Sequence, residues 1–254
     1  MHGLRSGIAV LRQEGCLKAR FPKPVDWHEL VTLNTSGGVA GGDDLDSEIV
    51  VGGGARCSVA SQAAERFYRA LPEDAPARVR TRISVGARAR VEWLPQESIL
   101  FRACAVDRAL DVDVAEDGWF LGVESLVFGR AAMGEVVDRA RLRDLIRVRR
   151  AGRLLLHDAI RFDGDVAGVM AGVAVAAGGA AVATLVHVAP AADAALEGLR
   201  AAWESVEAEC GASAWDGMLV GRVVAKDGAS LRAAVLAGLQ ALRGGRAMPR
   251  VWMC

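Results

Sequence analysis

The sequence predicts a mainly β fold with two α-helices in its C-terminal part. Many short segments alternate between apolar and polar residues, which is typical of strands with one buried face. Apolar residues recur with a spacing of three and four near residues 191–210 and 229–243, which indicates two helices that each bury one stripe. No linker and no repeat of solenoid length interrupts the chain, so we expect a single domain over residues 1–254.

The composition favours a globular protein that works with other proteins. The 254 residues are 52% hydrophobic, enough to bury a substantial core. The 31 basic and 31 acidic residues leave no formal net charge. Nothing therefore favours a nucleic-acid backbone or an anionic membrane surface over a protein partner.

The cysteines and the first residues indicate a cytoplasmic location. The five cysteines are odd in number, widely spaced and without a CxxC motif: Cys16, Cys57, Cys104, Cys210 and Cys254. This pattern argues against both a disulfide framework and a zinc knuckle, so we expect reduced thiols. The first 15 residues have too short an apolar run for a secretory signal.

A glycine-rich segment, LNTSGGVAGGD from Leu33 to Asp43, is the most informative part of the chain. It contains four glycines: Gly37, Gly38, Gly41 and Gly42. A dinucleotide fingerprint needs a helix after such a bend, but here strand-like alternation follows. We expect the glycines to supply positive φ and close backbone approach at a bend between strands.

The strands follow in chain order. The clearest pattern covers Val79–Trp93, within which Gly86 is expected to mark a bend or bulge. The other predicted strands are Leu110–Val114, Trp119–Phe128, Leu145–Arg149, Leu154–Phe162 and Met218–Ala225. Short strands at this density indicate a mainly β architecture.

A stretch without charged residues, from Val166 to Ala192, is long enough to span a bilayer. It consists mainly of Ala, Gly and Val, whereas a membrane helix would carry more Leu, Ile and Phe. Alternation on both sides of Gly178 and Gly179 favours a hairpin of buried strands.

Two helices follow the hairpin. The first is predicted from apolar residues at helical spacing: Leu196, Leu199, Trp203, Val206 and Cys210. The second is predicted in the same way from Leu231, Val235, Leu239 and Leu242. Ser230 near its start and Gly244-Gly245 just past its end are typical of a capped helix.

No residue pattern indicates catalysis. A GxSxG elbow, an HExxH helix and an aspartate dyad are all absent from the sequence. The histidines have no metal-ligand spacing and are expected to be structural: His2, His28, His157 and His187. Cys254, at the end of the chain, is expected to be a free tail residue, because a lone thiol is a poor site for a divalent ion.

Several polar residues lie in otherwise apolar stretches. They are Asn34, Asp43, Gln62, Glu65, Arg66, Glu97, Glu124 and Arg130. Because an unpaired buried charge costs several kcal/mol, one interpretation is ion pairing, of Glu124 with Arg130 or of Glu65 with Arg66 or Arg69. The other is that several of these carboxylates line a wet internal passage, and both can hold at different residues.

Four motifs in order resemble the urease accessory proteins of the UreD (also called UreH) type. The first is the glycine-rich segment; the others are Gln62 to Arg66 with Tyr68-Arg69, Trp93 to Glu97 with Ile99 and Phe101, and Gly129-Arg130 with Met133 to Glu135. The resemblance extends over nearly the whole chain, as far as the tail Pro249 to Trp252. The residues that carry it as structural motif are Asn34, the four glycines, Gln62, Arg66, Tyr68 and Arg130.

The resemblance implies a β-helix-like stack of strands flanked by two helices. It also implies a non-enzymatic role in urease maturation, with UreF, UreG and apo-urease as partners in a hetero-oligomer and with UreG joining through UreF. A nickel route has been proposed for the family. By motif match the candidate nickel ligands are Asp43, Glu65 and Glu97, then Glu124, each holding nickel in transit rather than as a permanent cofactor.

The ligands of such a route must bind Ni²⁺ weakly. Carboxylate and water oxygens hold Ni²⁺ weakly enough to release it, whereas a closed His/Cys cluster would trap it.

Two alternative functions remain open at the level of sequence. A structural adaptor would need surfaces but no metal path. An enzyme acting on a nucleotide or small metabolite would need the glycine bend to bind phosphate.

Overall fold

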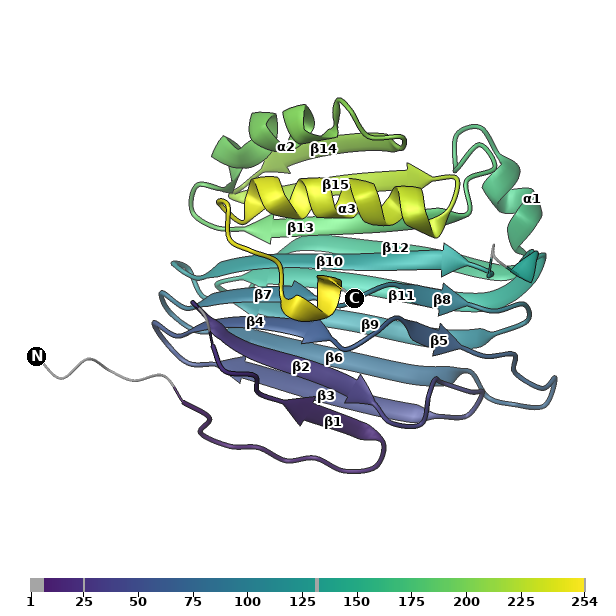
Figure 1. Ribbon diagram of the computed structural model, residues 1–254, viewed down its shortest axis with the longest axis horizontal. Helices are drawn as coiled ribbons and strands as arrows, with labels where there is room; N and C mark the ends of the chain where they lie inside the picture. Colours follow the sequence, from purple (N-terminus) through teal and green to yellow (C-terminus); the bar gives the residue numbers. More distant parts are fainter. Residues whose placement is uncertain (1–6, 25, 131–132, 254) are drawn as a thin grey trace, which may run out of the picture.

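The computed structural model describes residues 7–24, 26–130 and 133–253, and it forms two packed β-sheets with helices on the outside of one of them (Figure 1). Sheet A contains β1 (Leu17–Arg20), β2 (His28–Asn34), β4 (Arg56–Ser61), β5 (Glu65–Phe67), β7 (Arg90–Leu94), β8 (Ser98–Leu100), β10 (Trp119–Phe128), β13 (Ala181–Val188), β14 (Glu209–Trp215) and β15 (Met218–Ala225). Sheet B contains β3 (Asp44–Val51), β6 (Ala77–Val85), β9 (Ala105–Val114), β11 (Arg139–Arg150) and β12 (Arg153–Asp165).

The central part of the chain winds as a β-helix. It alternates between the sheets, so that β2, β4, β7 and β10 stack in parallel in sheet A. In the same way β3, β6, β9 and β11 stack in parallel in sheet B. The β-helix-like stack implied by the resemblance is therefore confirmed, and antiparallel strands extend each sheet beyond it.

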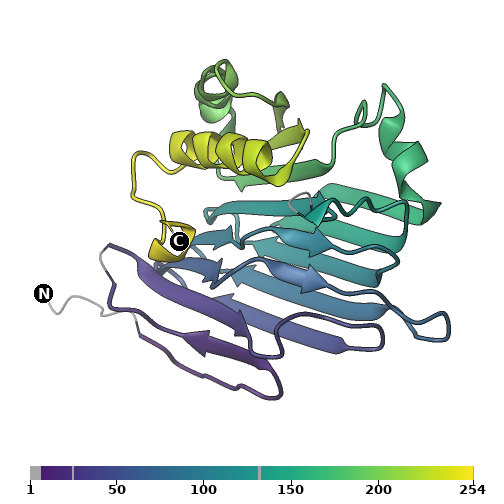
Figure 2. The same ribbon diagram turned by 45° about the vertical axis from the view of Figure 1, so that its right-hand side comes forward.

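The α-helices of the described residues are α1 (Val166–Ala171), α2 (Leu196–Trp203) and α3 (Gly228–Leu242), with short 3₁₀ segments at Ala192–Ala195 and Arg250–Met253. Helices α2 and α3 cover the outer face of sheet A at its C-terminal edge, whereas α1 contacts β11 and β12 of sheet B. Helices α2 and α3 pack together over β13, β14 and β15, whereas α1 stands at the end of the molecule away from the C-terminal segment (Figures 1 and 2). No helix of the described residues is long and apolar enough to cross a membrane.

Three hydrophobic clusters form the interior. The outer cluster joins sheet A to α2, α3 and the C-terminal segment, and it includes Leu199 and Leu239. The other two lie between the sheets: the first inter-sheet cluster contains Val112 and Phe120, and the second contains Phe67 and Leu142. A seam of polar residues, described below, separates these two.

The predicted strands Trp119–Phe128 and Met218–Ala225 have the predicted bounds, but the pattern over Val79–Trp93 belongs to two strands. Strand β6 ends at Val85 in sheet B, and β7 begins at Arg90 in sheet A. Gly86 therefore starts the turn that carries the chain between the sheets. A Cβ at this position would lie 2.9 Å from the backbone nitrogen of Gly53, so the close approach of the two turns requires glycine.

The predicted hairpin over Val166–Ala192 is wrong in its first half. That half forms α1, which Asp165 caps by accepting a hydrogen bond from the backbone of Gly168 at 2.8 Å, and a series of turns. Only Ala181–Val188 is a strand, and its partners are β10 and β15. Small residues alternating with valine suit either structure, and Val173 is 91% exposed rather than buried.

The first C-terminal helix is shorter than predicted. The observed helix ends at Trp203, and Cys210, which was predicted to belong to it, lies in the edge strand β14. The sequence pattern did not indicate this strand. The second helix is close to its prediction, but its N-cap is Asp227, whose side chain accepts from the backbone of Ser230 at 2.8 Å. Helix α1 adds a third helix to the two that were expected.

Candidate functional site

The glycine-rich segment connects β2 to β3 and so has a strand on both sides, as predicted. Gly37 and Gly38 have φ values of 82° and 151°, which favour glycine. The Tyr68 ring packs on Gly38, and its hydroxyl donates to the Gly37 carbonyl at 2.8 Å. The bend offers no helix N-terminus to a phosphate. Positive φ explains Gly37 and Gly42, and close packing explains Gly38 and Gly41.

This packing predicts different costs for two adjacent substitutions. A Cβ on Gly38 would lie 2.3 Å from a Tyr68 ring carbon and 2.9 Å from the Arg66 carbonyl oxygen, whereas a Cβ on Gly37 would meet nothing within 4 Å. We expect Gly38→Ala to destabilise the fold by about 2–3 kcal/mol, because strain and overpacking add, and Gly37→Ala by about 1 kcal/mol from backbone strain. Urea unfolding of both variants measures the difference, and equal losses would contradict this account.

The four candidate nickel ligands lie in three different places. Asp43 is exposed at the end of the glycine bend, where it accepts from the backbone of Ala40 at 2.8 Å. Glu97 lies on the helix side of sheet A and forms an ion pair of 3.0 Å with Arg232 of α3. Glu65 and Glu124 share the face of sheet A that is turned toward sheet B, because Phe67 and Leu126, two residues further along each strand, belong to the second inter-sheet cluster.

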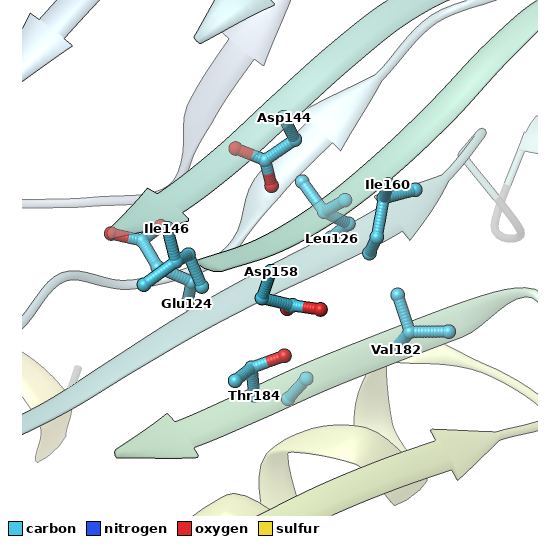
Figure 3. Close-up of a pocket in the computed structure, with 9 residues that line it drawn as sticks. Glu124, Leu126, Asp144, Ile146, Asp158, Ile160, Val182 and Thr184 are labelled. Atoms are coloured by element: carbon cyan, nitrogen blue, oxygen red, sulfur yellow. The ribbon is translucent and has the colours of Figure 1, made fainter. Parts of the chain in front are cut away.

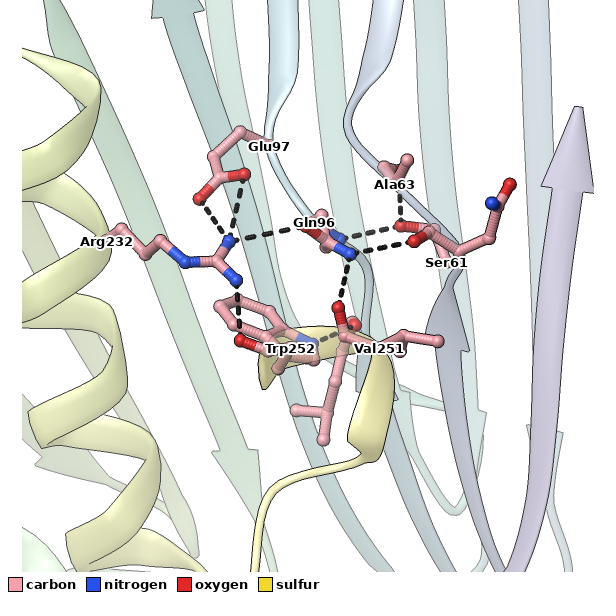
Figure 4. A network of polar contacts seen from close by, with 9 residues as sticks. Ser61, Ala63, Gln96, Glu97, Arg232, Val251 and Trp252 are labelled. Atoms are coloured by element: carbon pink, nitrogen blue, oxygen red, sulfur yellow. Dashed lines mark hydrogen bonds and ion pairs between the residues drawn. The ribbon is translucent and has the colours of Figure 1, made fainter. Parts of the chain in front are cut away.

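The contact of Glu97 belongs to a network that holds the C-terminal segment on sheet A (Figure 4). Arg232 donates to the Trp252 carbonyl at 2.8 Å, and Gln96 donates to the Val251 carbonyl at 2.9 Å. The Trp252 indole donates to the Leu94 carbonyl at 3.0 Å. Glu97 thus helps to anchor the end of the chain. Of the motif residues around it, Gln62 is exposed and receives a bond from Gln96 on its carbonyl.

A polar seam crosses the space between the two sheets. It consists of inward-facing polar residues, one to a strand: Ser98, Arg108, Glu124, Asp144, Asp158, Thr184 and Arg222. Residues two positions away belong to the hydrophobic clusters, so that Val106 and Leu110 flank Arg108 on β9. Glu65 extends the seam across β5, since it pairs in register with Ser98.

Arg108 is the central residue of the polar seam. Its guanidinium contacts Asp144 through two bonds of 2.8 and 2.7 Å and Glu124 at 2.7 Å. It also donates to Ser98 at 2.9 Å. Glu124 receives a further bond of 2.7 Å from the Trp93 indole. The ion-pairing interpretation of Glu124 was therefore right in kind but wrong in partner, since Arg130 pairs with Glu135 instead.

Beside this group lies a second ion pair. Arg222 of β15 contacts Asp158 of β12 at 2.6 Å and also bonds Thr184 of β13. A cavity with room for roughly one water molecule lies between the two ion pairs, and Glu124, Asp144, Asp158 and Thr184 line it (Figure 3). The seam is thus buried around Arg108 and Glu124 but reaches the surface at Arg222, whose side chain is 43% exposed.

Burial sets the charge balance of the seam. Burial raises the pKa of Glu124, an effect that Arg108 offsets only in part. Burial alone would lower the pKa of Arg108, but Asp144 and Glu124 outweigh it and raise the pKa, so the guanidinium stays charged. The seam from Ser98 to Arg222 holds three carboxyl groups against two guanidinium groups and so has one surplus acid, which a proton or a cation can neutralise.

Glu65 is held differently. It accepts two bonds from the Asn34 amide at 3.2 and 3.3 Å and one from the backbone nitrogen of Arg66 at 3.1 Å. Burial raises the pKa of Glu65, against these hydrogen bonds and the nearby charge of Arg66. Glu65 makes no ion pair with another residue of the described ranges, so the proposed pairing with Arg66 or Arg69 is wrong.

The seam is not a ready-made metal site. Among the described residues, no three His, Cys, Asp or Glu side chains are placed to hold a metal ion together. Burial raises the pKa of the Cys57 and Cys210 thiols to about 11 and of Cys104 to about 12, so these thiols remain protonated at neutral pH. His2 and Cys254 lie outside the described residues.

His187 is the histidine buried in the interior of sheet A. Its Nδ1 lies 2.9 Å from the Phe120 carbonyl oxygen, and burial lowers its pKa, so the ring stays neutral at pH 7. His187 is therefore structural, as expected from the sequence.

Sequence reasoning found Glu65 and Glu124 but missed the partners of Glu124. The alternation of the two strands could have identified these partners. Arg108 and Asp144 each occupy a position that alternates in step with apolar residues, which are buried between the sheets. It also missed Glu92 on the other face of sheet A. This residue is fully buried and bonded to Ser58, Arg243 and Arg246.

Comparison with known proteins places this architecture in a family. Residues 2–253 match the family model described as the UreD urease accessory protein. Proteins named urease accessory protein UreD from Rhizobium leguminosarum bv. viciae and Rhizobium etli are each 45% identical over 249 residues, which cover 98% of this chain and 90% of each relative. The namesake from Azorhizobium caulinodans is 43% identical over 250 residues, with coverage of 98% and 91%. The chain belongs to the UreD family of urease accessory proteins.

Proposed function

We propose that the chain acts in urease maturation as a non-enzymatic scaffold that binds apo-urease and UreF, with UreG joining through UreF. We further propose that Ni²⁺ passes along the polar seam between its sheets. Membership of a family of urease accessory proteins supports a role in urease maturation and association with urease and other accessory proteins. The nickel route rests on the surplus of carboxyl over guanidinium groups in the seam.

The chemistry of the seam suits transit. Oxygen ligands bind Ni²⁺ less tightly than thiolate or imidazole clusters do, so carboxylates and water release the ion again. Glu65, Glu124 and Asp158 lie along the inner faces of the sheets, with a water-sized cavity beside Glu124 and Asp158. A divalent cation would compete with Arg108 for Glu124 and Asp144, so passage requires the guanidinium to move aside. In this proposal Arg108 holds the route closed when no ion is present.

The test compares carboxylates within the seam with carboxylates outside it. Glu65→Gln and Glu124→Gln keep side-chain shape and remove a seam charge, whereas Asp43→Asn and Glu97→Gln are matched changes at residues that lie off the seam. We expect the seam variants to co-purify with the other maturation proteins while the nickel content of the matured urease falls several-fold. The two control variants should leave the nickel content unchanged.

A structural adaptor without a metal path is the second candidate. The observation that favours it is that the carboxylates of Glu124, Asp144 and Asp158 already have protein partners at 2.6–2.8 Å. This candidate predicts full nickel content whenever the complex assembles. Unchanged nickel in Glu65→Gln and Glu124→Gln urease would therefore decide for the adaptor and against the conduit.

A further inference from the structure

A basic pocket of about 470 Å³ opens on the surface, where the crossing loops leave β5, β8 and β10. Its lining consists of Tyr68, Arg69, Phe101, Arg102, Arg130 and Arg139, with Ala103 and Glu135. Tyr68, Arg69, Phe101, Arg130 and Glu135 come from three of the four motifs that carry the family resemblance, whereas Arg102, Ala103 and Arg139 lie outside them. The polar seam contains none of the pocket residues. The pocket and the seam lie apart, because Phe67, Leu100 and the rest of the second inter-sheet cluster separate them.

The pocket is preformed. Backbone hydrogen bonds tie its loops together, from Ala70 to the Ala103 carbonyl at 3.1 Å and from Ala103 to the Arg139 carbonyl at 2.8 Å. The Tyr68 and Phe101 rings meet edge to face at 5.1 Å, and the Arg130 guanidinium lies 4.3 Å from the Phe101 ring centre. A ligand would therefore meet aromatic and cationic groups that are already in place.

The pocket carries a surplus of positive charge. Arg130 pairs with Glu135 at 2.7 Å, and Arg102 makes two bonds of 2.7 and 2.9 Å to Asp138. Arg69 and Arg139 are exposed, and neither side chain bonds a carboxylate within the described ranges. Four guanidinium groups thus face two carboxylates, and two of the four are available to a ligand.

Exposed apolar residues lie close to the pocket residues in sequence. Val136 follows Glu135, and Leu71 and Met133 are two residues from Arg69 and Glu135; they are 67%, 53% and 72% exposed. Exposed apolar side chains around Arg, Tyr and Phe are typical of protein interfaces. A nucleic-acid backbone would instead need a longer basic track, whereas this chain has no net charge.

We propose that the basic pocket binds an acidic segment of a partner protein, whose carboxylates contact Arg69 and Arg139 and whose apolar side chains cover Leu71, Met133 and Val136. The pair between Arg102 and Asp138 shows how a guanidinium in this pocket takes a carboxylate through two parallel bonds. The inference rests on the proposed function only in that it assumes a protein partner. It does not depend on nickel passing through the seam.

The test uses charge reversal on the full chain. Arg69→Glu/Arg139→Glu removes the two available cations, and Arg56→Glu/Arg90→Glu is the control. Those control residues are also exposed, make no ion pair with a described residue and adjoin each other in register on sheet A, outside the pocket. The probe is a labelled peptide of alternating Glu and Leu, measured by fluorescence anisotropy, with an alternating Lys and Leu peptide for comparison.

We expect the wild type and the control to bind the acidic peptide, and Arg69→Glu/Arg139→Glu to weaken binding at least about tenfold through loss of two charge-assisted contacts. Added salt should weaken wild-type binding. Equal binding by wild type and Arg69→Glu/Arg139→Glu would overturn the proposal. So would a site that binds inorganic phosphate but not the acidic peptide, since that is a small-anion site.

A second measurement separates this inference from the proposed nickel route. Arg69→Glu/Arg139→Glu should lose one of the maturation partners on co-purification, whereas Glu124→Gln should retain all of them. If Arg69→Glu/Arg139→Glu retains every partner, the pocket is not a docking site and this inference fails, whatever happens to nickel. If Glu124→Gln urease contains full nickel, the conduit fails and the docking pocket stands.

Discussion

Replacing Arg108 with methionine is expected to destabilise the fold by about 3–5 kcal/mol, because the change leaves Glu124 and Asp144 buried without their counter-charge. Methionine fills a similar volume, so the loss measures the charges rather than a cavity. Glu124 and Asp144 are 8% and 5% exposed, so solvent cannot replace the lost counter-charge. Urea unfolding at neutral pH measures the loss.

The pH dependence distinguishes this cause from a packing defect. In Arg108→Met the folded-state pKa of Glu124, which burial already raises, should rise further above the unfolded value, so the deficit should shrink as the pH falls and Glu124 becomes protonated. Arg82→Met, which removes the half-exposed pair with Asp46, is the control and should cost far less. A deficit in Arg108→Met that stays constant with pH, or that equals the control, would contradict the buried network.

Patterns within a single strand could be predicted from the sequence. Trp119–Phe128 and Met218–Ala225 have the predicted bounds, because each is a continuous strand whose alternation ends where the strand ends. The alternation failed over Val79–Trp93, because it continues through a turn that moves the chain from one sheet to the other. The small residues after Val166 suit a strand and a helix alike. The N-cap at Asp165 was the sequence feature that indicated a helix there.

The candidate site could be predicted only in part, because its partners are set by the winding of the chain. Glu124 was recognisable as a charge in an apolar segment, but its partner Arg108 lies across the interior on the other sheet. Proximity in sequence suggested Arg130 as the partner of Glu124, but Arg130 forms an ion pair with Glu135 at the surface instead. Spacing along the chain carries no information about which strands of a two-sheet stack face each other.

Glu92 is the second buried charge whose loss should be severe. It lies on the outer face of sheet A, where Arg243, at the end of α3, donates two bonds of 2.8 and 3.0 Å. Ser58 and Arg246 bond the same carboxylate, and the Arg246 guanidinium also lies 3.8 Å from the Trp27 ring centre. These contacts connect β7 to the segment that follows α3.

Replacing Glu92 with glutamine is expected to cost about 3 kcal/mol, because the shape is kept while Arg243, only 3% exposed, loses its counter-charge. Burial alone would raise the pKa of Glu92, but Arg243 with Ser58 and Arg246 outweighs it and lowers the pKa. The wild-type stabilisation is therefore fully present above the ordinary glutamate pKa of 4.5 and is lost as the pH falls through the lower folded value.

Two measurements check the Glu92→Gln prediction. The gap in unfolding free energy between wild type and variant should be widest near neutral pH and should narrow below pH 4.5, where wild-type Glu92 also begins to lose its charge. Proteolysis should cut the variant first after α3, since the substitution weakens the bond from Arg246 to residue 92, which ties the loop from Gly244 to Met248 to β7. A gap that widens in acid would mean that Glu92 is protonated in the native protein and that the cluster is held by hydrogen bonds rather than by charge.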